Sequence, residues 1–331
     1  MASDRAGLSV YAGAEIGGIF RKPADGTHWQ PLTQGLPPAP EVRAIAVHPQ
    51  QPQVVYAGTQ EGPYRSTDAG DHWERLDFPG PERVGWSFTF HPTDPRVMYY
   101  GTAPGTIFRS TDGGDHWRRL PTDLGSDVVT MQFPTRTIAI ALDPAHPDEL
   151  YAGLEVAGVI RSLDGGSTWQ AVNRGLAPDV GRLDLHGVQV SAAQPGTVFI
   201  SVRAGLFRSA DRGEHWEAID LSQVSPITYC RDLRLSPSDP RTLYVSLGKA
   251  ARSGEGALYR SPDLGATWER VDRGLIPKST MMGVALTARD PACIYGCTRD
   301  GEVFGTHDGG AQWQEYPLPS GTREVRAIAC G

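Results

Sequence analysis

Side chains that bind anions or move protons stand at the start of one β-rich run in five of seven sequence repeats. When these runs are aligned through the Pro-containing turn that follows most of them, one position holds Arg43, Trp86, Ile138, His186, Arg231, Met282 and Arg326. The position two residues earlier holds Glu41, Val84, Arg136, Asp184, Tyr229, Thr280 and Glu324. Arginine grips a carboxylate or phosphate through two parallel hydrogen bonds. The pattern predicts a pocket for a small anionic molecule or a carboxylate-bearing chain end.

Groups suited to proton transfer stand among these arginines. His186 stands two residues after Asp184, and Tyr229 is the residue aligned with Asp184 in the next repeat. These three side chains predict acid–base chemistry. Turns between the second and third runs add Glu15, Glu61, Glu155, Arg203, Arg299 and Asp300, and the longest of these turns, 248–256, is expected to form a lid. The catalytic candidates are His186, Asp184, Tyr229 and Glu155. The substrate-binding candidates are Arg43, Trp86, Arg136, Arg231, Arg326, Glu15, Arg203 and Arg299.

Two further interpretations of these residues stay open. A glycosidase would need two carboxylates facing each other across about 5–10 Å, drawn from Glu15, Glu61, Glu155 and Asp184. Alternatively, the strand starts form a solvated rim in which Glu41 neutralises Arg43 and Glu324 neutralises Arg326.

The elements that must position these side chains are marked by an eight-residue box of pattern Ser/Thr-x-Asp-x-Gly-x-x-Trp. Six copies end at Trp73, Trp117, Trp169, Trp216, Trp268 and Trp313, and a damaged seventh ends at Trp29. Short Asp and Ser side chains close a turn around backbone N–H groups, Gly supplies an unusual backbone angle, and Trp packs between layers. A calcium-loop interpretation of Asp68/Asp71 and Asp112/Asp115 is disfavoured because most copies lack the second acid. The boxes are therefore interpreted as structural.

Each repeat contains four short β-rich runs, and the third leads into the box. Repeats of this length are typical of propellers, so the chain is expected to be all-β, a single seven-bladed propeller domain over residues 1–331. Six blades are expected at 41–78, 83–121, 136–174, 184–220, 227–273 and 279–318. Residues 323–331, which resemble the run that begins at Glu41, are expected to supply the first strand of a seventh blade over 8–35.

The boxes resemble those of the Asp-box, or BNR, β-propeller family, and the resemblance covers nearly all of the chain. Members include sialidases, xyloglucan-active glycoside hydrolases, sortilin-like receptors and the photosystem II assembly factor family. Sialidases hold a sugar carboxylate with an arginine cluster but have six blades, and the xyloglucan-active enzymes place their site between two propellers. The resemblance therefore implies the fold firmly and leaves the function open.

Two functions from different classes follow. The first is a small-molecule hydrolase or lyase, similar to glycosyl hydrolases, that acts on an anionic or sugar-like substrate at the channel mouth. The alternative is a non-catalytic scaffold that binds a protein or peptide through an arginine-lined face, as the resemblance to the assembly factors implies. A deep pocket would favour the enzyme, and a flat basic rim would favour the scaffold.

Composition excludes several other classes. A net charge of −7 argues against nucleic-acid binding, and no apolar run is long enough to span a membrane. The four cysteines show neither a disulfide framework nor zinc spacing, and the N-terminal stretch does not resemble a signal peptide, so a cytoplasmic location is expected. Because the sequence contains no nucleotide-binding or metal-ligand motif, neither a cofactor nor a metal is expected.

Overall fold

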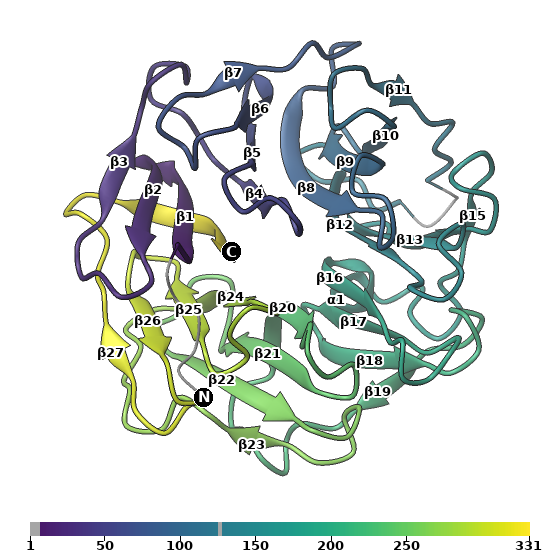
Figure 1. Cartoon of the computed structure of the whole chain (residues 1–331). Coiled ribbons are helices and arrows are strands. Elements are labelled where there is room, and N and C mark those ends of the chain that lie inside the picture. The colour runs from purple at the N-terminus through teal and green to yellow at the C-terminus, as the bar shows by residue number, and fades with distance from the viewer. Residues whose placement is uncertain (1–6, 125–127) are drawn as a thin grey trace.

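The computed structural model describes residues 7–124 and 128–331 and contains seven four-stranded antiparallel sheets arranged around a central channel (Figure 1). This confirms the predicted seven-bladed propeller. From the channel outward, blade 1 holds β28 (Arg323–Cys330), β1 (Ser9–Ile16), β2 (Gly18–Pro23) and β3 (Gln30–Leu32). Blade 2 holds β4 (Ala44–Val47), β5 (Val55–Thr59), β6 (Gly62–Ser66) and β7 (Glu74–Arg75). Blade 3 holds β8 (Val84–Phe90), β9 (Met98–Ala103), β10 (Thr106–Ser110) and β11 (Arg118–Arg119).

The remaining blades follow the same order. Blade 4 holds β12 (Arg136–Leu142), β13 (Leu150–Glu155), β14 (Gly158–Ser162) and β15 (Gln170–Ala171). Blade 5 holds β16 (Leu185–Val190), β17 (Val198–Val202), β18 (Gly205–Ser209) and β19 (Glu217–Ile219). Blade 6 holds β20 (Tyr229–Leu235), β21 (Leu243–Gly248), β22 (Gly256–Ser261) and β23 (Glu269–Arg270). Blade 7 holds β24 (Met281–Leu286), β25 (Ile294–Thr298), β26 (Val303–Thr306) and β27 (Gln314–Glu315).

The ring is closed by pairing the two ends of the chain, as the sequence predicts. Strand β28 runs antiparallel to β1, with Val10 opposite Cys330, and the Ser9 N–H donates to the Gly331 carbonyl at 2.9 Å. Figure 1 shows the yellow β28 beside the purple β1. The closing strand buries Val325 and Ile328 in the core between blades 7 and 1. Closure removes two sheet edges that would otherwise stay open.

Each box forms a turn built on its hydroxyl and its carboxylate. In blade 2, the Ser66 hydroxyl donates to Asp68 Oδ1 at 2.8 Å and accepts from the Gly70 N–H at 2.7 Å. Asp68 Oδ1 also accepts from the His72 N–H, and these bonds lower the pKa of Asp68 to about 2. Gly70 has a φ of +102°, and a Cβ there would lie 2.6 Å from Leu32 of the preceding blade. The box glycine is therefore required by both backbone angle and packing.

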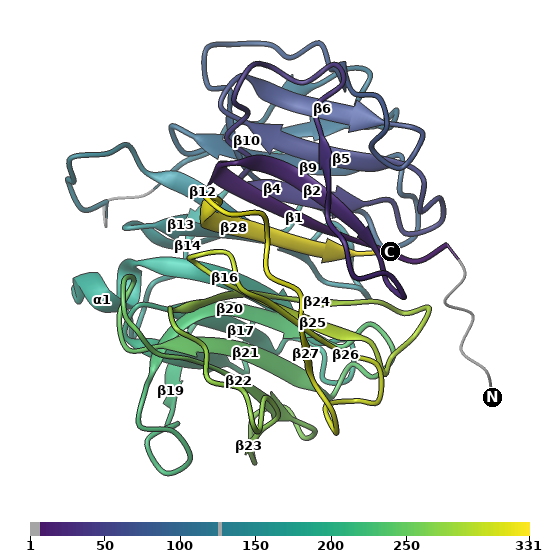
Figure 2. The ribbon, with the colours of Figure 1, turned by 90° about the vertical axis from the view of Figure 1, so that its left-hand side faces the viewer.

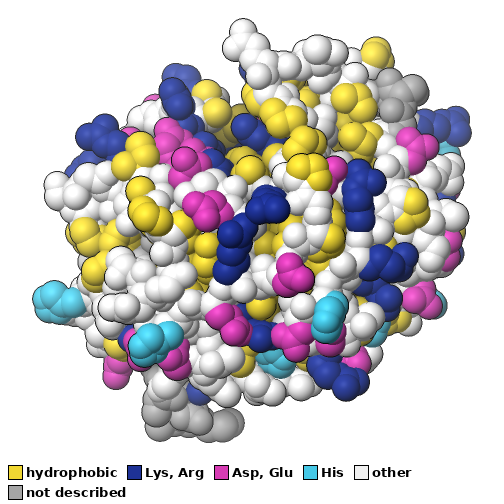
Figure 3. Space-filling view, turned by 90° about the horizontal axis from the view of Figure 1, so that it is seen from above, with side chains coloured by type: hydrophobic (Ala, Val, Ile, Leu, Met, Phe, Trp, Pro, Cys, Tyr) yellow, Lys and Arg dark blue, Asp and Glu magenta, His cyan; other side chains and the backbone are white. Residues whose placement is uncertain are grey.

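The boxes and the channel entrance with the arginines lie on opposite faces of the ring. Figure 2 shows the ring from the side, with the helical turn α1 (Val180–Leu183) at one face and the end of β28 at the other. We call the face with α1 the mouth face and the other the box face. Within 7–124 and 128–331, α1 is the only helix, and no helix there is long and apolar enough to cross a membrane. On the side of the ring seen in Figure 3, acidic and basic side chains are interspersed.

Candidate functional site

The side chains aligned in the sequence meet at the mouth because most inner strands carry a β-bulge at the same place. On β8, Gly85 pairs with Thr102 and Ser87 with Gly101, so Trp86 has no partner on β9. The same register shift isolates Ile138, His186, Arg231, Met282 and Arg326 on their strands. A bulge re-aims the side chain of its extra residue. All of these except Ile138 and Met282 are polar or aromatic, and all line the channel together with Arg43.

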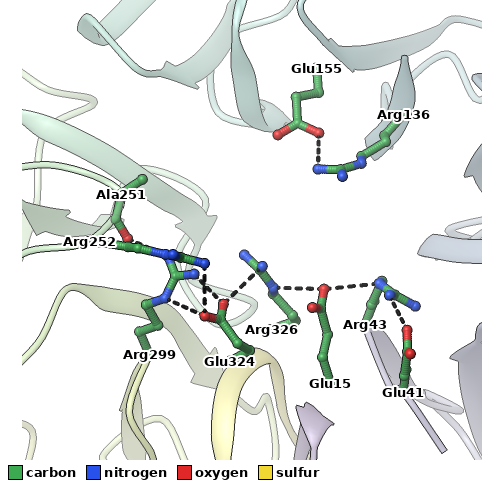
Figure 4. A network of polar contacts seen from close by, with 10 residues as sticks. All are labelled: Glu15, Glu41, Arg43, Arg136, Glu155, Ala251, Arg252, Arg299, Glu324 and Arg326. Carbon is green, nitrogen blue, oxygen red and sulfur yellow. Dashed lines mark hydrogen bonds and ion pairs between the residues drawn. The ribbon is translucent and has the colours of Figure 1, made fainter. Parts of the chain in front are cut away.

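A row of alternating charges runs along blades 7, 1 and 2 (Figure 4). Glu15 Oε1 accepts from Arg43 Nε at 3.0 Å and from Arg326 Nε at 3.1 Å. Glu324 accepts from Arg326 at 3.1 Å, from Arg252 at 3.3 Å and from the buried Arg299. Burial opposes ionisation of Glu324, but the Arg299 hydrogen bond and the nearby arginines outweigh burial and lower its pKa. Glu324 is therefore held as an anion by the arginines.

Glu41 extends the row and also pairs with Arg43. The predicted neutralisation of Arg43 by Glu41 and of Arg326 by Glu324 is thus present, although Glu15 and Arg299 take part as well. Glu324 adopts a left-handed backbone angle (φ 55°), which is uncommon for a residue with a side chain.

A second ion pair stands apart from this row, across the channel. Arg136 Nη1 lies 2.6 Å from Glu155 Oε2 (Figure 4). The Arg136 guanidinium stacks over Trp86, with 4.5 Å to the ring centroid. Phe133 covers the guanidinium at 4.3 Å. Arg43 approaches Trp86 as well, at 5.3 Å. Two cations thus stack on one indole ring, an arrangement that fixes Trp86 as part of the wall.

Blades 5 and 6 bring His186, Tyr229 and Asp184 together. His186 is buried, and its Nδ1–H donates to the Cys230 carbonyl at 2.7 Å. Its Nε2 lies 3.4 Å from the Tyr229 hydroxyl and 3.7 Å from Asp184 Oδ1. Burial, reinforced by the charge of Arg231, lowers the pKa of His186 well below its usual value. His186 is therefore neutral at pH 7.

Asp184 has the opposite electrostatic character from the paired glutamates. Burial and the nearby charge of Glu155 raise its pKa to about 6, against the attraction of Arg231, Arg203 and Arg136. Its Oδ1 is buried and has no hydrogen-bond partner in the described structure. A carboxyl group that is half protonated near pH 6 beside a neutral imidazole is able to exchange a proton.

Arg231 differs from the other inner-strand arginines because it has no carboxylate partner within the described residues, whereas Arg43, Arg136 and Arg326 are paired. The charge of Arg231 acts to lower the pKa of both Asp184 and Tyr229, although burial raises the pKa of each. Arg203 is exposed and likewise unpaired with any described acid. The cavity that Arg231 lines has a volume of about 130 Å³, small compared with typical ligand pockets of about 300–1,000 Å³. It suits the polar head of a ligand rather than a whole drug-sized molecule.

The other residues predicted for the mouth lie further out. Glu61 and Asp300 are exposed, and their side chains make no contact with the charged row within the described residues. The 248–256 loop is tied to blade 7, because the Ala251 carbonyl accepts from Arg299 at 2.7 Å and Ser253 contacts Thr280 at 3.0 Å. Sequence reasoning missed Phe133, which lies in an irregular stretch without a repeat equivalent, and Arg252, which lay within the expected lid. No group of three metal-ligating side chains occurs in the described ranges.

Comparison with known proteins identifies a family and a set of distant relatives. The model described as "DUF6242 beta propeller domain" matches residues 2–281. The oligoxyloglucan-reducing end-specific xyloglucanase of Emericella nidulans is 22% identical over 361 residues, covering 95% of this chain and 40% of the enzyme. A Paenibacillus xyloglucanase is 27% identical over 312 residues, covering 79% of this chain and 30% of the enzyme. The chain therefore spans at most 40% of the length of these relatives.

Solved structures show the same fold. The xyloglucanase of glycoside hydrolase family 74 from Xanthomonas campestris aligns with a TM-score of 0.67 and 21% identity, covering 88% of this chain and 47% of that chain. YCF48 bound to D1 peptide aligns with a TM-score of 0.59 and 17% identity, covering 93% of this chain and 88% of that chain. Identities this low show a shared fold alone. By the match over residues 2–281, the chain belongs to the family of DUF6242 beta propeller domains.

Proposed function

We propose that the mouth of the channel is a binding site for a carboxylate, carried by a small acid or by a chain end. The observation that carries this proposal is Arg231, which a β-bulge aims into the channel and which has no acidic partner among the described residues. An unpaired, half-buried guanidinium beside a tyrosine hydroxyl is suited to bidentate capture of a carboxylate. Arg203 stands nearby to add positive potential.

Binding fits the other residues better than hydrolysis does. Glu15, Glu155 and Glu324 are each held by arginines, so they are not free to act as a nucleophile or a base. The small cavity also suits a head group. The single-ring similarity to a peptide-bound YCF48 and the Asp-box pattern of the turns add support for a scaffold that binds a peptide or small acid.

The test is a calorimetric titration with acetate, succinate, inorganic phosphate and a short peptide as its free acid or C-terminal amide. A ligand that binds only the folded state also raises the Tm. We expect a free carboxylate to bind wild type and to lose at least tenfold in affinity in Arg231→Gln. Arg118→Gln, which removes an exposed arginine of the outer strand β11, is the matched control and should bind normally. Equal binding by wild type and Arg231→Gln, or no binding by any acid, would overturn the proposal.

One observation favours a second candidate, a glycoside hydrolase. Asp184 carries a pKa raised to about 6, and a general acid in a hydrolase needs a carboxyl group whose pKa is raised in this way. The distant xyloglucanases motivate the substrate. Release of reducing ends from xyloglucan oligosaccharides, lost in Asp184→Asn, would support this candidate. If wild type released no reducing ends between pH 5 and 7, this candidate would be rejected.

A further inference from the structure

On the box face, an arginine from the third strand of one blade reaches the box of the next blade. It pairs with the acid two residues before the box Trp and also donates to a carbonyl two residues before that acid. The three examples are Arg21 with Asp71 (2.8 Å) and the Ala69 carbonyl (2.9 Å), Arg65 with Asp115 (2.7 Å) and the Gly113 carbonyl (3.1 Å), and Arg161 with Glu214 (2.8 Å) and the Arg212 carbonyl (2.7 Å). These contacts join neighbouring blades.

A tyrosine on the second strand supports the same turn at two of these junctions. Tyr11 donates to the Ala69 carbonyl at 3.0 Å, and Tyr56 donates to the Gly113 carbonyl at 2.8 Å. The turn carbonyl there accepts one bond from tyrosine and one from arginine. Both lone pairs of the carbonyl oxygen are thereby used.

The junction of blades 5 and 6 has lost both contacts. Strand register places Arg208 opposite Phe199, as Arg65 stands opposite Tyr56, so Phe199 replaces the tyrosine and has no hydroxyl. The acid position of the blade 6 box holds Ala266. Arg208 has no ion pair with any acid in the described part of the chain and makes no hydrogen bond with the Leu264 carbonyl, the acceptor expected there.

Two other junctions that keep the arginine also lack the box acid, and their arginines make other contacts, although the buried Arg109 Nε has no hydrogen-bond partner among the described residues. Arg109 faces the ring of Tyr99, with 5.9 Å to its centroid, and Arg260 pairs with Glu269 of its own blade. Arg208 has no equivalent contact: Glu217, opposite it on β19, is not paired with it.

A groove of about 580 Å³ occupies the place where the missing acid would sit. Arg208 and Ala266 line it, and Trp268, Ile219 and Val224 supply apolar walls. Val224 is 41% exposed, unusually for a large apolar residue. Asp220 lies at the groove as an ionised carboxylate, because hydrogen bonds from Ser222 lower its pKa. The groove thus offers one cation and an apolar surface. By equivalence with the Ala69 and Gly113 carbonyls, the Leu264 carbonyl is the backbone acceptor beside it.

We propose that this groove binds an extended segment of a partner protein in which one Asp or Glu stands next to a bulky apolar residue. The carboxylate pairs with Arg208 in place of the missing box acid, a backbone N–H of the segment donates to the Leu264 carbonyl, and the apolar residue packs on Trp268 and Val224. A free small acid supplies the charge but not the N–H. Asp220 disfavours segments with several acids.

The full-length chain is tested on an array of random hexapeptides, and the selected peptides are then titrated by fluorescence anisotropy. We expect selection of a single Asp or Glu beside a bulky apolar residue, and at least a tenfold loss when that acid becomes Asn or Gln. Ala266→Asp restores the box acid, so it should occupy Arg208 and weaken binding at least tenfold, as should Arg208→Gln. Ala311→Asp makes the same change in the blade 7 box, where Arg260 already has a partner, and should leave binding unchanged.

Three results would overturn this assignment. The first is an array that selects no acidic–apolar pair. The second is that the selected peptides bind Ala266→Asp as tightly as wild type. The third is that peptide binding is lost in Arg231→Gln and kept in Arg208→Gln, which would place the binding site at the mouth. A fourth arm uses 3-phenylpropionate. If this small acid binds wild type as tightly as the peptides do, and is lost in Ala266→Asp, the occupant is a free acid and the peptide assignment fails.

Discussion

Replacing Glu15 with Gln removes the charge that joins blades 1 and 2 at the mouth. Glu15 Oε1 accepts from Arg43 and Arg326 at 3.0 and 3.1 Å, and the three side chains are 23%, 12% and 18% exposed. A hydrogen bond to a charged group contributes about 1.5–3 kcal/mol, and leaving a partly buried charge without its partner adds to the loss. Because the amide still accepts hydrogen bonds and water screens the group in part, we expect a loss of about 2–3 kcal/mol.

The free energy of unfolding is measured by urea denaturation followed through tryptophan fluorescence, with calorimetry for the Tm. For a chain of this size the loss corresponds to about 3–4 °C. Glu41→Gln is the matched control, because Glu41 contacts one arginine only and is 42% exposed, so its loss should stay below about 1 kcal/mol. If Glu15→Gln were no more costly than Glu41→Gln, the bridging role of Glu15 would be refuted.

Three further predictions concern the mouth, the packing and the closure of the ring. Burial raises the pKa of Asp184 to about 6 from an unfolded value of about 3.9, so the native state binds a proton that the unfolded state releases. The free energy of unfolding should therefore fall by about 2–3 kcal/mol as the pH rises from 4 to 6. Asp184→Asn should abolish that fall in pH-dependent urea titrations, and an unchanged slope would contradict the raised pKa. Gly85→Ala would place a Cβ 2.0 Å from the Tyr100 hydroxyl and 2.8 Å from Gly58 Cα, so a loss of about 2–3 kcal/mol is expected by calorimetry, whereas Gly254→Ala, whose Cβ meets nothing closer than 3.9 Å, should be near neutral. Deleting residues 324–331 removes Val325 and Ile328 from the core and exposes the edge of β1, so the cooperative transition in the calorimetric scan should disappear. A truncated chain that keeps the wild-type Tm would show that ring closure contributes nothing to stability.

The ring itself follows from the sequence because its signals are local and repeated. The spacing of the box tryptophans predicts seven blades, and the similarity between the runs at Glu41 and Glu324 predicts the closing strand. Aligning the runs also places His186, Arg231 and Trp86 at one channel entrance, since a shared bulge sets them at the same height.

The pairing of charges could not be read from the sequence. Glu15 lies between Arg43 and Arg326, which come from distant parts of the chain, and its choice of both depends on side-chain geometry across blades. Phe133 reaches Arg136 from a stretch without any repeat pattern. The neutral state of His186 likewise depends on burial and on the Cys230 carbonyl of the next blade. Arg231 differs from the other inner-strand arginines only because Arg43, Arg136 and Arg326 have carboxylate partners and Arg231 has none among the described residues.

The bulges on the inner strands have a consequence for how this mouth changes in evolution. Because a bulge residue faces the channel without a partner on the second strand of its sheet, its side chain can be replaced without disturbing the ladder beside it. Isoleucine, methionine, histidine, tryptophan and arginine already occupy equivalent places in different blades. Single substitutions can therefore change the charge and shape of the mouth one blade at a time, while the closed ring keeps its backbone pairing.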